Sequence, residues 1–231
     1  MIELEEIRNR ARQDLVIVTD LGFEDVYLWE RSVRITESAA RIAQLPDLAA
    51  YSLDPVALEI TGLYHDAGWI SQYQDGVVTR EQIGCKLTTP VQRELGAALM
   101  ERSLQDVLPA DTLQYASDAI RSLNDHNVAI FEAQLVAEAE NLDAFGALAL
   151  WHLARKHAHE GRGLEAAIET WEAQKQYGYW TARINDSLRF EAVKRIAQER
   201  LAVFDRAIKR LTAHHRGEDI STAVLESSRT Q

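Results

Sequence analysis

The sequence predicts an all-α fold, and three observations carry that prediction. Apolar residues recur at alternating steps of three and four over several long stretches, which is the pattern of one buried helix face. Only 4 prolines and 11 glycines interrupt the 231 residues, so long helices can form. Convincing runs that alternate polar and apolar residues are absent, and the apolar segments at residues 16–18 and 76–78 are too short to predict a sheet.

The first predicted helix covers residues 24–44. Leu28, Ile35 and Ile42 form one column of its apolar face, because residues seven apart return to the same side of a helix. No Ser/Gly-rich linker separates the later elements, so we expect one helical domain over residues 1–215, followed by a polar C-terminal tail over residues 216–231. Three more helices are predicted over residues 109–124, 129–157 and 187–214, the last being a long C-terminal helix.

Two dipeptides mark further helix starts between these stretches. Asp54-Pro55 and Thr89-Pro90 each place an N-cap residue before a proline at the first helical position. The sequence therefore predicts one helix from each of these points. In the second of them, the residues expected on the outer face are Gln92 and Arg93.

Composition excludes several classes of protein. There are 25 Lys and Arg against 36 Asp and Glu, which gives a net charge of −11 and disfavours a general nucleic-acid surface. A local basic pocket for a small anionic ligand is still compatible with this charge. Cys85 is the only cysteine, so neither an internal disulfide nor a cysteine-based zinc site is expected. No apolar stretch reaches the ~18 residues of a membrane span, and we expect a cytoplasmic protein without membrane contact.

The segment LYHDAGW holds the most distinctive local pair, His65 and Asp66, near the end of an apolar helix. A neutral imidazole and an adjacent carboxylate can bind one divalent cation such as Mn, Fe, Ni or Zn. The alternative is a capped helix end in which the histidine has an ordinary structural role.

Several segments resemble the HD-domain superfamily of metal-dependent phosphohydrolases, whose metal ligands are a His, a His-Asp pair and a later Asp. LYHDAGW resembles the signature segment, WERSVRITESAARIA the helix that carries the first His, and EAQLVAEAENLDAFGALAL the segment with the last Asp. AIRSLNDHN resembles a stretch that holds further histidines, and FEAVKRIAQERLAVFDRAIKRL resembles a closing helix. The resemblance covers about residues 25–211 and implies a single HD-domain-like helical bundle.

This chain departs from the family pattern at two of the four ligand positions. Arg31 stands in place of the first His, and Glu140 in place of the last Asp. Next to it, Asn141 replaces the usual arginine. The matching residues are His65, Asp66 and Arg34, and His126 fits the position of an additional histidine.

Arg31 cannot ligate a metal, because a guanidinium stays protonated and has no lone pair to offer. It shares a helix column with Leu28 and Ile35, so we expect it to point inward, toward Asp66 and Glu140. A guanidinium would then occupy the place of the metal. In the alternative arrangement, Arg31 turns outward and His126 replaces it as a ligand.

Two functions follow from these alternatives. One is a metal-dependent phosphohydrolase acting on a small nucleotide or phosphate ester, with His65, Asp66, Glu140 and His126 around a divalent transition metal and Arg34 or Arg31 neutralising phosphate. The other is a protein without a cofactor, in which Arg31, Arg34 and His126 bind a small anionic, nucleotide-like ligand or the site binds a partner protein. The two changed positions favour the second function. A homodimer is compatible with both.

Other candidate residues are expected to have structural roles. Asp143 lies one helical turn after Glu140 and is a candidate hydrogen-bond partner of His65 or His126. One group of histidines is expected on a solvated helix face: His152, His157 and His159. A group of aromatic residues is expected to pack a loop onto the core or to form a dimer contact: Trp171, Tyr177, Tyr179 and Trp180.

Overall fold

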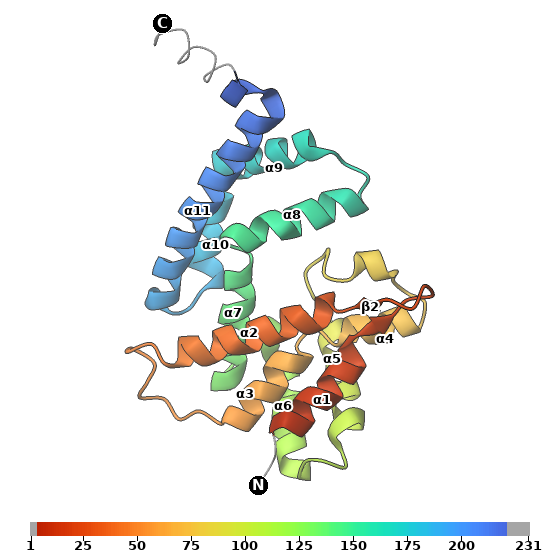
Figure 1. The fold of residues 1–231 in the computed structure, drawn as a ribbon. Helices are drawn as coiled ribbons and strands as arrows, with labels where there is room; N and C mark the ends of the chain where they lie inside the picture. Colours follow the sequence, from red (N-terminus) through yellow and green to blue (C-terminus); the bar gives the residue numbers. More distant parts are fainter. Residues whose placement is uncertain (1–3, 221–231) are drawn as a thin grey trace, which may run out of the picture. The chain divides into compact units, whose positions relative to one another are not determined.

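The computed structural model describes residues 4–220, which form eleven α-helices, two short 3₁₀ turns and one two-stranded sheet (Figure 1). The predicted all-α helical bundle is confirmed. The chain divides into two compact units, Met1–Leu142 and Asp143–Gln231, which are described separately. Among the described residues, no helix combines the length and the apolar character that a bilayer crossing requires. The cytoplasmic location and the domain boundary at residue 215 stay predictions.

The first unit contains the N-terminal hairpin and most of the helices. β1 pairs antiparallel with β2, with Ile17 opposite Asp25 and Val18 opposite Glu24. Each of these strands has only two residues, which is why period-2 alternation gave no signal for them. The elements of this unit are α1 (Leu4–Leu15), β1 (Ile17–Val18), β2 (Glu24–Asp25), α2 (Tyr27–Ala43), α3 (Pro55–Tyr64), α4 (Gly68–Gln74), η1 (Arg80–Gln82), α5 (Pro90–Leu104), α6 (Ala110–Arg121), η2 (Ser122–Asn124) and α7 (Phe131–Asp143).

Helix α3 is the centre of this unit. The Asp54 side chain caps it by accepting hydrogen bonds from the backbone N–H groups of Val56 and Ala57, so the predicted start is confirmed. Every residue from Ala57 to Tyr64 is buried, and α1, α2, α5 and α6 all pack against this helix. The residues that follow α3, which include the His-Asp pair, are therefore held inside the unit and not at its surface.

The start of α5 corrects one prediction. The helix begins at Pro90, as the start signal predicted, and Thr89 and Gln92 form a capping box. Gln92 and Arg93 are 4% and 2% exposed, however, and do not lie on an outer face. The reason is a close approach of α5 to the start of α4: a Cβ on Gly68 would lie 1.9 Å from the Gln92 carbonyl oxygen. The first turn of α5 is consequently packed against the rest of the unit.

The second unit contains four helices. The single helix predicted over residues 129–157 was wrong, because the chain forms α7 and α8 there. Gly146 has a φ of 86°, a left-handed conformation that other residues rarely adopt, and the chain therefore forms two helices where one was predicted. Helix α11 follows the predicted C-terminal helix closely and ends at a left-handed Gly217. Most of the predicted tail lies outside the described residues. The elements of this unit are α8 (Ala147–His159), α9 (Leu164–Gln176), α10 (Tyr179–Ser187) and α11 (Glu191–Arg216).

Aromatic side chains form the core of the second unit. Trp171 packs on Phe204 with 4.6 Å between ring centroids, and Phe145 meets Trp180 edge-on at 5.5 Å. The two tryptophans therefore pack into a core as expected, but from helices α9 and α10 and not from a loop, whereas Tyr177 is 82% exposed.

The histidines of α8 do not all lie on a solvated face. His157 is 3% exposed, and burial lowers the pKa of its imidazole, with Arg162 lowering it further. His152 Nε2 lies 3.0 Å from Asp143 Oδ2 within this unit. The solvated-face prediction was thus wrong for His157, because α8 packs against both α9 and α11.

Candidate functional site

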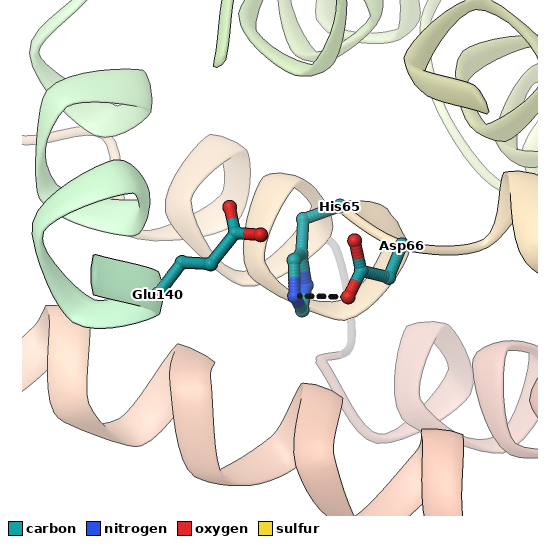
Figure 2. Close-up of side chains that lie close together, drawn as sticks. All are labelled: His65, Asp66 and Glu140. Atoms are coloured by element: carbon teal, nitrogen blue, oxygen red, sulfur yellow. Dashed lines mark ion pairs between the residues drawn. The ribbon is translucent and has the colours of Figure 1, made fainter. Parts of the chain in front are cut away.

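The candidate site lies in the first unit, where the end of α3 meets α7. His65 and Asp66 follow α3 directly and are 0% and 1% exposed. Glu140 extends from the last turns of α7, and its side chain is 19% exposed. Figure 2 shows its carboxylate directed toward His65 and Asp66. One ligand atom from each of these three residues lies within 4.8 Å of the others.

Arg31 of α2 reaches into this group of ligand atoms. Its Nη1 forms an ion pair with Asp66 Oδ2 and lies 2.9 Å from His65 Nε2. Its Nη2 lies 3.7 Å from Glu140 Oε1. The side chain of Arg31 is 13% exposed. Arg31 therefore points inward, as its position on the helix column predicted, and its guanidinium lies among the three ligand atoms.

A second arginine, which the sequence analysis missed as a site residue, holds the other sides of the same carboxylates. Arg93 Nη1 donates to Asp66 Oδ1 at 3.0 Å and to the His65 carbonyl oxygen, while its Nη2 donates to Glu140 Oε2 at 2.6 Å. Arg93 thus contacts one oxygen of each carboxylate, Asp66 Oδ1 and Glu140 Oε2, which we call the far oxygens. Arg31 pairs with the other two, Asp66 Oδ2 and Glu140 Oε1, which we call the near oxygens. This division fixes the orientation of both carboxylates and directs Asp66 Oδ2 and Glu140 Oε1 toward Arg31.

Neutral groups complete the hydrogen bonding around Asp66 and Arg93. Thr88 donates its hydroxyl to Asp66 Oδ1 at 2.5 Å and accepts from the Trp69 indole at 3.1 Å. The Asn124 side-chain oxygen accepts from Arg93 Nε at 3.0 Å, and its amide nitrogen donates to the Thr88 carbonyl at 2.9 Å. These bonds matter because a buried charge is stable only when its hydrogen-bonding groups are satisfied.

The charges of the cluster compensate one another when His65 is neutral. Arg31 and Arg93 provide two positive charges, and Asp66 and Glu140 provide two negative ones. Burial, with the added repulsion of Arg31, lowers the pKa of His65 to about 3, so its imidazole is uncharged at neutral pH. Burial alone would raise the pKa of Glu140, but the positive charges of Arg93 and Arg31 hold it well below its usual range.

The hydrogen bonds of His65 also indicate its tautomer. Its Nδ1 lies 2.7 Å from the Gly62 carbonyl, which only accepts, so the proton of a neutral imidazole is on Nδ1. Nε2 then carries the lone pair, and that lone pair faces Arg31. The atom that would bind a metal therefore accepts a hydrogen bond from a guanidinium.

A divalent cation does not fit this arrangement while Arg31 lies inside. The structure offers three ligand atoms, and a permanent positive charge lies at hydrogen-bonding distance from the only nitrogen among them. Two like charges at such a separation repel each other at any effective dielectric constant of a protein. The donor set without Arg31 is suited to a transition metal, so Arg31 is the residue that prevents the fit.

The remaining residues predicted for the site are placed as follows. Arg34 is half-buried on α2, one turn after Arg31. His126 is exposed in the loop after η2, and the cluster of possible metal ligands found among residues 4–220 does not include it. Asp143 belongs to the second unit, where it pairs with His152.

One unused signal in the sequence, Gly96, bears on the burial of Arg93. Gly96 lies three residues later and therefore on the same face of α5, and a Cβ there would lie 3.1 Å from both the Gly68 nitrogen and the Tyr64 carbonyl oxygen. A glycine inside a helix often marks a close approach of another backbone. Gly96 did not enter the sequence analysis, but it shares the packed face of α5 with Arg93 and is the one local sign of that face.

The acid sensitivity of the fold tests the neutral, buried state of His65. In the folded protein its pKa is about 3, whereas an unfolded histidine has a pKa of about 6.5. Below pH 6.5 the unfolded state therefore binds a proton that the folded state does not, and stability is lost as the pH falls toward 3. We therefore measure the free energy of unfolding by urea titration at several pH values between 6.5 and 5. As the pH falls, we expect it to decrease more steeply in the parent than in His65→Gln, and the two slopes should differ by about 1 kcal/mol per pH unit. Parallel pH profiles would contradict this assignment.

Comparison with solved structures agrees with this description of the fold. A protein from an uncultured Thermotogales bacterium, described as a predicted HD superfamily hydrolase, aligns with a TM-score of 0.54 and 19% identity over 91% of this chain and 92% of its own. Bacillus subtilis YpgQ, solved in complex with ADP, aligns with a TM-score of 0.56 and 15% identity over 90% of this chain and 96% of its own. The chain has an HD-domain-like fold.

A third solved structure has the same fold, whereas comparison of the sequence with protein families and curated proteins finds no match. The Lin1889 protein from Listeria innocua aligns with a TM-score of 0.57 and 15% identity over 93% of this chain and 98% of its own. No family model matches the sequence, and no curated protein does so. At these identities the solved structures establish the HD-domain-like fold alone, and the function depends on the site described above.

Proposed function

We propose that this chain is a non-hydrolytic protein with an HD-domain-like fold, in which Arg31 takes the place of the metal ion and the site binds a small anionic, nucleotide-like ligand. The observation that carries the proposal is the position of the Arg31 guanidinium, which contacts His65 Nε2 and Asp66 and lies 3.7 Å from Glu140. Phosphate-ester hydrolysis by a metal site requires an ion that polarises the phosphoryl oxygen and generates hydroxide. An arginine supplies positive charge but cannot bind and ionise water in this way.

The contacts of Arg31 indicate how an anion would bind. Its Nη2 makes the loosest ion pair of the cluster, 3.7 Å from Glu140 Oε1, against 2.6 Å for Arg93 and the other oxygen of that carboxylate. The side chain of Arg31 is also the more exposed of the two guanidinium groups, 13% against 3%. Planar guanidinium groups bind phosphate oxygens in pairs, so Arg31, with Arg34 one turn away, is suited to a phosphate group. The complex of YpgQ with ADP makes a nucleotide the first ligand to test. A homodimer and a protein partner stay predictions.

An active phosphohydrolase is the second candidate, because His65, Asp66 and Glu140 still bring three ligand atoms within 4.8 Å. In that case Arg31 would have to leave the cluster before a metal could bind. The two candidate functions make different predictions: the hydrolase releases phosphate from its substrate when metal is supplied, and the non-hydrolytic protein does not.

We expect hydrolysis of generic phosphate esters and nucleotides to remain near background when Mn, Co, Ni or Mg is supplied. The reason is that Arg31 occupies the place among the ligand atoms that the ion would need. Release of phosphate, measured for the parent and for His65→Ala and Asp66→Ala, distinguishes the two functions. A substantial rate that both substitutions abolish would overturn the proposal and establish the hydrolase.

Binding of ADP without metal tests the other half of the proposal. Calorimetric titration in the presence of EDTA is expected to show binding to the parent, and Arg31→Gln is expected to weaken it at least tenfold, or about 1.4 kcal/mol. Arg121→Gln is a matched control, because that arginine pairs with Glu94 and Glu101 on the surface of the same unit. Equal affinities of the parent and Arg31→Gln, or no binding by the parent, would contradict an anion site at Arg31.

A further inference from the structure

Glu140 is the carboxylate of the charged cluster that Arg31 holds least tightly. Its Oε2 accepts a hydrogen bond from Arg93 Nη2 at 2.6 Å, whereas its Oε1 lies 3.7 Å from Arg31 Nη2. The second distance is beyond the range of a protein hydrogen bond, so charge attraction alone joins these two atoms. Arg93 therefore anchors one oxygen of Glu140, and the other oxygen makes only a loose contact with Arg31.

Asp66 is held much more firmly. Its Oδ1 accepts hydrogen bonds from Thr88 at 2.5 Å and from Arg93 at 3.0 Å, and its Oδ2 forms the ion pair with Arg31. Its side chain is 2% exposed, against 19% for the side chain of Glu140. Of the two carboxylates beside Arg31, Glu140 is therefore the one that a ligand from solvent can reach and replace.

The charge of the cluster restricts how an anion can bind to Arg31. With His65 neutral, the two guanidinium groups are already balanced by two carboxylates. A further negative charge in a site largely withdrawn from water would stay uncompensated, and the nearest carboxylate would repel it. An anionic group therefore binds well only if it takes over a contact that one of these carboxylates now makes.

From these observations we infer that Glu140 is the residue that determines how strongly the site selects an anionic ligand, because its near oxygen holds the position on Arg31 that a phosphate group takes. This inference rests on the proposed function, in which Arg31 binds the anion. When a phosphate binds, Glu140 Oε1 leaves Arg31 while Oε2 stays on Arg93. The phosphate can replace the carboxylate because its oxygens form strong, charge-assisted hydrogen bonds with a guanidinium.

Glu140→Gln is the direct test, because glutamine keeps the length of the side chain and an oxygen for Arg93 but has no charge with which to hold Arg31. Calorimetric titration in the presence of EDTA is expected to show that Glu140→Gln binds ADP at least tenfold more tightly than the parent, which equals about 1.4 kcal/mol. Adenosine, which has no phosphate, is expected to show no such gain. A purely structural role of Glu140 predicts the opposite result, since a damaged site binds ADP less tightly.

Glu101→Gln is the matched control. Glu101 lies in the same unit and also pairs with an arginine, Arg121, at 3.2 Å, but its side chain is 41% exposed. The substitution removes the same charge from the chain, and we expect it to leave the affinity for ADP unchanged, because solvent and salt screen an exposed charge. An equal gain in Glu101→Gln would attribute the effect to net charge and would overturn the inference.

A measurement on the parent keeps the inference testable should Glu140→Gln fold poorly. On addition of ADP, the side-chain carboxyl carbon of Glu140 is expected to change its NMR chemical shift more than that of Asp66, because only Glu140 loses its contact with Arg31. The inference is overturned by an unchanged Glu140 signal at saturating ADP, or by ADP binding to Glu140→Gln that is no tighter than to the parent. Absence of ADP binding by both proteins would instead overturn the proposed function and this inference together, so the two failures give different results.

Discussion

Replacing Arg93 with Met is expected to lower the free energy of unfolding by about 3–5 kcal/mol. The substitution removes the cation that contacts Asp66 Oδ1, Glu140 Oε2 and the His65 carbonyl oxygen, and it leaves two buried carboxylates with one guanidinium between them. Breaking a buried ion pair from one side costs this much because the remaining charge has lost its compensation. Unfolding by urea, followed by far-ultraviolet circular dichroism at pH 7, measures the change directly.

Arg121→Met is the matched control for this loss. Arg121 also pairs with two carboxylates, those of Glu94 and Glu101, but its side chain is 32% exposed against 3% for Arg93. Exposed ion pairs contribute little, so we expect this control to lose less than about 1 kcal/mol. A loss for Arg93→Met no larger than for Arg121→Met would show that the buried cluster does not depend on Arg93.

Replacing Arg31 with His is expected to create a site for a divalent transition metal. The change removes the permanent positive charge and introduces a lone pair, while Arg93 continues to hold the far oxygens of both carboxylates. The near atoms, His65 Nε2, Asp66 Oδ2 and Glu140 Oε1, are the ones that face the guanidinium in this structure. The double variant with Glu140→Asp restores every ligand type of the HD pattern and should bind Mn or Ni at least tenfold more tightly than the parent, which equals about 1.4 kcal/mol.

Calorimetric titration with Mn or Ni compares the parent, Arg31→His and the double variant. Arg31→Gln is the matched control, because it removes the same charge but adds no imidazole. Metal should also raise the melting temperature of the two histidine variants and leave that of the parent unchanged, since a ligand that binds only the folded state stabilises it. Equal metal affinities in the parent and the double variant would mean that Arg31 does not block the site.

The sequence by itself determined the helical class, the two capped helix starts and the pair His65 and Asp66 at the end of a buried helix. These are local properties: an N-cap residue before proline, a 3.6-residue period and a short motif act through neighbours in the chain. The column of Leu28 and Ile35 also predicted the inward orientation of Arg31, because a position on a helix face depends on the period alone.

Only the tertiary structure decided the role of Arg93 and the break at Gly146. Arg93 is polar and lies in the first turn of α5, where a solvent-facing side chain is the usual expectation, and its burial results from the close packing of α5 on Gly68. Its partners Asp66 and Glu140 are 27 and 47 residues away in the sequence, so no local pattern joins them. A buried charge is stable only where distant elements bring compensating groups to it, and that arrangement is a property of packing and not of any one segment.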